Sequence, residues 1–170
     1  MWYLPMIARL KRLFSNPRYS KLMSWHYEQA QKKIDEMLRH PSDASQWRKI
    51  DTIHPRFGEE ARNVRFALSI DGMNPFGDIS SSHSTWPVVL SILNISSCLC
   101  MKRKYLMLSI LIQGPKQPGN DIDMFLEPLL EDMADLWNDG ELKWDEFKQE
   151  CFMLRAMIFV AITDYPDGFS

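Results

Sequence analysis

The sequence predicts an α/β fold in which a basic helical region, residues 1–62, precedes a sheet-forming region, residues 63–170. Three observations support this prediction. The chain has 170 residues, of which 45% are hydrophobic, and this suits one domain with a core. Helical spacing of apolar residues gives way to strand-like patterning near residue 63. Charge divides at almost the same place, since residues 1–65 hold 13 Lys and Arg against 7 Asp and Glu, and residues 66–170 hold 7 against 15.

Two helices are expected in the first region. Apolar residues recur at helical spacing from Ser15 to Met37, with Pro17 near the start, and a shorter helix is expected from Gln46 to Ile53, ended by Pro55. A basic surface on such helices suits either a phosphate backbone or simple solvation. The candidates for contact with nucleic-acid phosphates are Arg9, Lys11, Arg12, Arg18 and Lys21.

Three strands are expected next. In the stretch 64–70, Val64, Phe66, Leu68 and Ile70 alternate with Arg65, Ala67 and Ser69, which is typical of a strand. The near-continuous apolar runs Trp86–Ile95 and Tyr105–Ile112 are typical of buried strands.

A helix and a fourth strand complete the predicted order. An apolar stripe from Ile122 to Trp137, followed by Gly140, predicts a helix that Pro128 kinks or restarts. Met157–Ile162 is apolar enough for a buried strand, whereas Phe152–Ala156 could equally form a helical turn. The expected order is three strands, a helix and a fourth strand.

Two acidic residues follow the first and the last of these predicted strands. Asp71 comes after the first strand and Asp164 after the last, so the two carboxylates converge if these strands are neighbours. Two carboxylates in a small volume repel unless a divalent cation neutralises them, and oxygen ligands suit Mg²⁺ or Mn²⁺. On spacing alone, an ordinary turn at Asp71 and a loop cap at Asp164 are the better-supported interpretation.

Other site classes find little support. Cys98, Cys100 and Cys151 form neither an even disulfide set nor a zinc motif, and the four histidines lack ligand spacing. No apolar run approaches the roughly 18 residues of a membrane span, and no signal peptide is apparent at the start. The sequence therefore predicts a soluble intracellular protein that does not contact a membrane.

Several long motifs occur in the order found in one family. These are residues 4–14 and 39–43, the stretch 62–77 (RNVRFALSIDGMNPFG), then 80–88, 99–102 and 114–123. Together they resemble plant CACTA (En/Spm-type) DNA transposases over nearly the whole chain. The resemblance implies an RNase H-like fold, of which the predicted strand order is the beginning, and a nuclear location.

The resemblance also implies a chemistry. Asp71 matches the first of three catalytic, metal-binding acids, and Asp164, in a motif that departs mildly from the family's Asn-Asp-Phe-Pro, matches the second. The implied reaction is cleavage and joining of DNA strands at transposon ends with Mg²⁺ or Mn²⁺. No residue matches the third acid, so we expect a truncated fragment that binds metal weakly and is inactive alone. The alternative is a non-catalytic DNA- or protein-binding remnant that associates with intact transposase or with itself.

Overall fold

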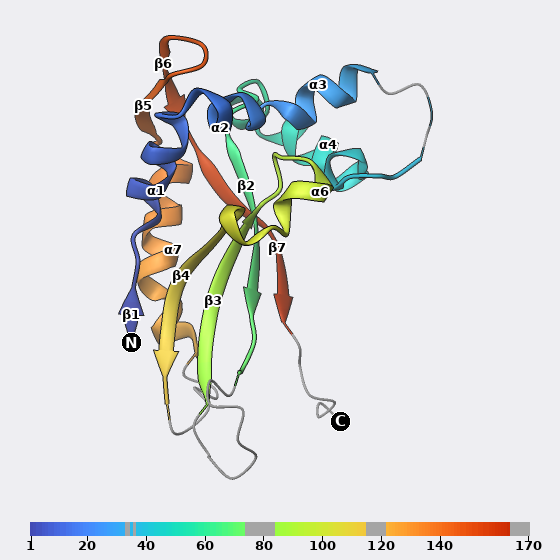
Figure 1. Ribbon diagram of the computed structural model, residues 1–170. Helices are drawn as coiled ribbons and strands as arrows, with labels where there is room; N and C mark the ends of the chain where they lie inside the picture. The colour runs from blue at the N-terminus through green and yellow to red at the C-terminus, as the bar shows by residue number, and fades with distance from the viewer. Residues whose placement is uncertain (33–34, 36, 74–83, 115–121, 164–170) are drawn as a thin grey trace.

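A five-stranded mixed sheet forms the centre of the protein in the computed structural model, which describes residues 1–32, 35, 37–73, 84–114 and 122–163 (Figure 1). The strand order is β1-β4-β3-β2-β7. Strands β2, β3 and β4 pair antiparallel, and β7 pairs parallel to β2. The bounds are Trp2–Tyr3 for β1, Val64–Ile70 for β2, Thr85–Ile92 for β3, Leu106–Gln113 for β4 and Ala156–Thr163 for β7.

The four predicted strands are confirmed, but the last is not buried along its length. Strand β7 lies at the edge of the sheet, and Val160 and Ile162 are 41% and 57% exposed. Its first residue, Ala156, is buried and belongs to the main core. The apolar composition of the strand could not distinguish a central strand from an edge strand.

Helices α1 (Met6–Phe14) and α7 (Ile122–Asn138) cover one face of the sheet and lie side by side in Figure 1. The predicted stripe on α7 is confirmed, and the helix continues through Pro128 without restarting. Short β1 pairs with β4, which ties the start of the chain to the sheet. The main core contains apolar residues of both helices and three strands: Met6, Leu10, Phe14, Phe66, Leu68, Leu90, Ile92, Ile110, Leu129, Met133 and Leu136.

The opposite face is covered around the start of β2. Helices α4 (Ser45–Ile53) and α5 (Pro55–Gly58) precede this strand, and Trp47 of α4 packs on Ala67 and Phe159. Arg65 and Ala67, which alternate along β2 with the residues of the main core, are buried as well. Strand β2 lies between β3 and β7, and at this end both of its faces are covered by packed side chains.

The helix predicted for residues 15–37 is instead divided into α2 (Pro17–Leu22) and α3 (Trp25–Lys32). Asn94 explains the break, because its side-chain amide donates to the carbonyl of Met23 and its backbone carbonyl accepts from the backbone N–H of His26. A helix passing through this point would use both groups within its own hydrogen-bond ladder. The start is as expected, since Asn16 caps α2 and Pro17 is its first residue.

A hairpin that the sequence did not predict lies between α7 and β7. Strand β5 (Glu141–Asp145) pairs antiparallel with β6 (Glu150–Leu154), so the helical turn considered for Phe152–Ala156 was wrong. The other short elements are η1 (Pro41–Asp43), α6 (Ser97–Cys100) and η2 (Arg103–Tyr105). Within the described ranges, no helix combines the length and the apolar character that crossing a membrane requires.

Candidate functional site

The carboxyl ends of β2 and β7 lie together, which is the condition under which the two acids would converge. The two strands pair in parallel from Val64 with Ala156 to Ile70 with Thr163. Asp71 is the next residue after Ile70, and Asp164 is the next after Thr163 in the sequence. Asp164 itself lies outside the described residues. The pairing of the strands therefore confirms the condition on which the two-acid hypothesis depends, and the position of the second carboxylate stays a prediction.

The backbone on either side of Asp71 is held by β3. Ile70 pairs with Val88 as well as with Thr163. Two residues after Asp71, the backbones of Met73 and Thr85 exchange hydrogen bonds of 2.9 and 2.8 Å. Asp71 is thus placed between two anchored positions and not in a tight reverse turn. Its exposed carboxylate extends from a fixed segment of backbone.

Gly72 allows an aromatic ring to pack beside this acid. A Cβ atom added at Gly72 would lie 2.7 to 2.9 Å from the indole of Trp86, which is closer than real side chains approach. The indole Nε1 donates to the hydroxyl of Ser84 at 3.2 Å. Glycine at this position therefore serves the close approach of strand β3 to the segment that carries Asp71.

The carboxylate of Asp71 is a suitable ligand for a hard divalent cation, but the described residues supply only part of a metal site. Asp71 is exposed and forms no ion pair with any residue that the structure describes. In the same part of the chain, no group of three His, Cys, Asp or Glu side chains is arranged to hold a metal. Carboxylate oxygen is the ligand that Mg²⁺ and Mn²⁺ prefer.

The five candidate phosphate-binding residues differ in how free their side chains are. Arg9 is half-buried and donates from its guanidinium to the carbonyl of Leu108, so it ties α1 to β4. The others are exposed on the first two helices: Lys11, Arg12, Arg18 and Lys21. None of the five lies beside Asp71, because Arg9 contacts the middle of β4 and α2 lies near the opposite end of the sheet (Figure 1).

A buried ionic cluster is centred on Arg62, just before β2. Its guanidinium donates to Asp145 at 2.9 Å and to Glu60 at 2.6 Å, and it also contacts exposed Glu150 at 2.9 Å. Asp145 accepts in addition from the Ser20 hydroxyl. Burial alone would raise the pKa of the Asp145 carboxyl, but hydrogen bonds from Ser20 and Arg62 outweigh it and hold that pKa below its usual range. The cluster joins α2, β2 and the hairpin.

A second buried cation, Arg65, lies on the face covered by α4. Its guanidinium pairs with Asp51 and is stacked 4.0 Å from the ring centre of Trp47 and 4.7 Å from that of Phe57. Burial lowers the pKa of Arg65 to about 10. None of the residues that the structure describes accepts a hydrogen bond from its Nε atom. We interpret this arrangement as structural, because it fastens α4 and α5 to the central strand.

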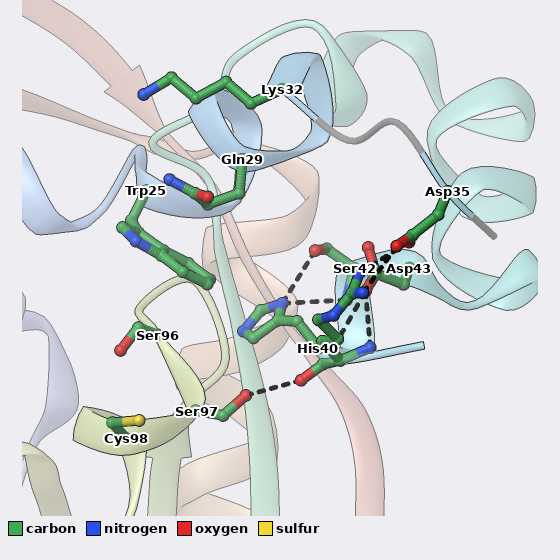
Figure 2. A pocket seen from close by; sticks show the side chains of 11 residues that line it. Trp25, Gln29, Lys32, Asp35, His40, Ser42, Asp43, Ser96, Ser97 and Cys98 are labelled. Atoms are coloured by element: carbon green, nitrogen blue, oxygen red, sulfur yellow. Dashed lines mark hydrogen bonds and ion pairs between the residues drawn. The ribbon is translucent and has the colours of Figure 1, made fainter. Parts of the chain in front are cut away.

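A cavity of about 480 Å³ opens between α3, α6 and the segment around η1 (Figure 2). Figure 2 shows Trp25 beside the imidazole of His40, with Gln29 and Lys32 above them. Both nitrogens of His40 are engaged, because Nδ1 accepts from the Ser42 backbone at 3.1 Å and Nε2 donates to the Ile95 carbonyl at 3.0 Å. This histidine therefore fixes the cavity wall and is not available as a metal ligand.

His26 provides a pH-dependent contribution to stability. It is buried against Trp47, and burial lowers its pKa from 6.5 to about 4, with a further lowering by Arg65. The unfolded chain binds a proton at this position below pH 6.5 and the folded chain does so only near pH 4. The free energy of unfolding is therefore unaffected by His26 above pH 6.5. As the pH falls from 6.5 to about 4, proton binding by the unfolded chain lowers this free energy by about 3 kcal/mol.

Urea unfolding between pH 7 and 4 measures this loss. We expect His26→Gln, which has no titrating ring, to show a weaker pH dependence than the parent. His54→Gln provides a matched control, because His54 is exposed. An unchanged pH dependence in the His26 variant would contradict the assignment.

Comparison with known families gives one match. The model of the family described as "Transposase family tnp2" matches residues 35–169, a range that contains Asp71, Asp164 and all strands except β1. Searches of curated proteins and of solved structures found no match.

Proposed function

Because this chain belongs to the tnp2 family of transposases, we propose that it carries two ligands of a divalent-metal site for DNA strand cleavage and joining, Asp71 and Asp164. The observation that supports this most directly is the parallel pairing of β2 with β7, which ends at Ile70 and Thr163. Both acids follow these paired residues directly in the sequence. Carboxylates at the carboxyl ends of adjacent parallel strands are well placed to share a cation.

The proposal extends to the fold and to the type of transposon. Three antiparallel strands, a long helix and a strand parallel to the first agree with the opening of an RNase H-like domain. The motifs at residues 62–77 and 114–123 favour the plant CACTA type and, with it, a nuclear location and transposon ends as the DNA partner.

The chain's own residues have a limited task in this chemistry. Bound Mg²⁺ or Mn²⁺ would activate the attacking water or hydroxyl and stabilise the leaving oxygen. Asp71 would hold the metal from a backbone that Val88 and Thr85 keep in place on both sides. Two carboxylates bind Mg²⁺ weakly without further ligands, so we propose metal binding without DNA cleavage by this chain alone.

Titration with Mn²⁺ tests the proposal. We expect paramagnetic broadening of the amide signals of Ile70 and Met73, and a fall in affinity of about tenfold or more, roughly 1.4 kcal/mol, on Asp71→Asn. Asp123→Asn is a matched control, because Asp123 is an exposed carboxylate on α7. Broadening that is absent, or that survives Asp71→Asn, would refute the metal site. Cleavage of transposon-end DNA by the purified chain would show instead that its ligand set is complete.

A further inference from the structure

Two basic segments that are distant in the sequence meet through a pair of tyrosines. Tyr19 of α2 and Tyr105 of η2 pack edge to face, with ring centres 6.0 Å apart. The ammonium group of Lys104 lies 4.8 Å from the ring centre of Tyr105 and 5.7 Å from that of Tyr19. The contact brings two groups of cations together, and we refer to these five residues as the basic patch: Arg18, Lys21, Lys102, Arg103 and Lys104.

The basic patch is not neutralised by the part of the protein that the structure describes. All five side chains are exposed, and none forms an ion pair with a described residue. Neither the stretch 16–22 nor the stretch 101–105 contains an acidic residue. The buried cations Arg62 and Arg65, in contrast, each have a carboxylate partner. Five cations from these two adjoining segments, none paired with a described carboxylate, repel each other and attract a polyanion.

Aromatic contacts restrain part of this surface before any partner binds. Lys104 rests against two tyrosine rings, and the ammonium group of Lys21 lies 5.5 Å from the ring centre of Phe147. Such contacts contribute roughly 0.5 to 1 kcal/mol each at exposed sites. Tyr19 is 37% exposed. A tyrosine hydroxyl beside lysines and arginines is a common donor to nucleic-acid phosphates.

The basic patch and Asp71 lie at opposite ends of the same strands. η2 leads directly into β4, and Gln113 at the other end of β4 pairs with Thr85, which also bridges to Met73 beside Asp71. Ile70 pairs with Val88, and Val88 pairs with Ile110, so Asp71 is level with about the sixth residue of β4. The separation along the strands is therefore roughly 17 Å at ~3.3 Å per residue. This corresponds to about five base pairs at ~3.4 Å each.

We propose that the basic patch binds the phosphate backbone of duplex DNA and holds it about five base pairs from the phosphate presented to Asp71. The inference rests on the proposed function for the identity of the polyanion. It adds Lys102, Arg103 and Lys104 to the candidate DNA-binding residues. It also gives Arg18 and Lys21 a role shared with a segment more than 80 residues away in the sequence.

The salt dependence of binding tests this proposal. The full chain and the triple variant Lys102→Ala, Arg103→Ala, Lys104→Ala are titrated with a labelled duplex of roughly 24 base pairs, between about 50 and about 200 mM salt. Each lost phosphate contact removes about 0.9 from the slope of log affinity against log salt, so we expect the triple variant to lose about 2 to 3. Equal thermal unfolding of both proteins confirms that the variant is folded.

Two matched variants separate the basic patch from general charge. Arg48→Ala, Lys49→Ala, Arg56→Ala removes three exposed cations from α4 and α5 and should leave the slope unchanged. Lys102→Arg, Arg103→Lys, Lys104→Arg keeps the charge and should keep the binding. An unchanged slope in the triple alanine variant, an equal loss in the α4 and α5 variant, or tighter binding to phosphatidylserine vesicles than to duplex would overturn the proposal.

Failure of this inference is distinct from failure of the metal site. The two proposals have different readouts, which are Mn²⁺ broadening at Asp71 and the salt dependence of DNA binding by the basic patch. If Mn²⁺ does not bind at Asp71 but the triple alanine variant shows the expected smaller slope of log affinity against log salt, the metal site is refuted and the basic patch stands. If Mn²⁺ binds and the slope of the triple variant is unchanged, the reverse holds.

Discussion

Arg62→Met is expected to lower the free energy of unfolding by about 3 to 5 kcal/mol, as measured by urea unfolding. Methionine preserves much of the packing of the Arg62 side chain, whose guanidinium lies 4.0 Å from the ring centre of Phe152. It removes the only cation paired with Asp145 in the described part of the chain, and that carboxylate is 1% exposed. An uncompensated buried charge costs far more than the pair itself contributes.

Two further variants identify the source of this effect. Glu150→Gln removes an exposed carboxylate that contacts the same guanidinium, and we expect a change below about 1 kcal/mol. Adding Asp145→Asn to Arg62→Met should recover part of the lost stability, because no uncompensated charge then remains buried. A loss below about 1 kcal/mol for Arg62→Met would show that Asp145 is adequately solvated or held by Ser20 and the backbone.

Asn94→Ala is expected to cost about 2 to 5 kcal/mol, since one side chain satisfies several buried backbone groups. Asn94 is fully buried. Its carbonyl oxygen accepts from the backbone N–H of Arg65 at 2.9 Å, and its amide donates to the carbonyls of Asn63 at 2.8 Å and Met23 at 3.2 Å. Alanine leaves these groups without partners at the junction of α2, α3 and β2.

The same urea measurement on Asn138→Ala provides the comparison. Asn138 is exposed at the end of α7, so we expect a change within about 0.5 kcal/mol. Hydrogen exchange adds a local readout, because the amide of Arg65 should lose protection in the Asn94 variant. A stable Asn94→Ala protein with a protected Arg65 amide would mean that water replaces the side chain.

The elements predicted correctly are those whose burial follows a simple pattern. Strands β2, β3 and β4 contain runs such as Val88, Leu90 and Ile92 that can be buried only in a sheet, and α7 has a continuous apolar stripe. The β5–β6 hairpin reverses this pattern. Lys143 and Asp145 are buried, whereas Leu142 is 64% and Trp144 45% exposed. Its turn also lacks a glycine signal, because Gln149 adopts the positive φ of 56°.

Long-range hydrogen bonds account for the other differences. No local spacing reveals that Asn94 would engage Met23 and His26 and so divide a helix. Asp71, in contrast, could be predicted as a candidate, because the motif at residues 62–77 resembles a transposase family, whereas its position after a strand alone favoured an ordinary turn. The basic patch could be predicted only in part. Arg18 and Lys21 were candidates, but the contact of Tyr19 with Tyr105, which brings Lys104 to them, joins segments that nothing in the sequence relates.

The parallel pairing of β2 with β7 has a consequence for the order of folding. Val64 cannot pair with Ala156 until the ribosome has synthesised the 92 positions that follow Val64. Strands β2, β3 and β4, in contrast, can pair with their neighbours in the sequence as a meander. At about 5 to 20 residues per second, a ribosome needs roughly 5 to 20 s to synthesise the intervening chain. Closure of such a long loop raises the contact order and slows folding. The nascent protein therefore carries an open strand edge on β2 for seconds, a state in which mispairing with another chain competes with the native partner.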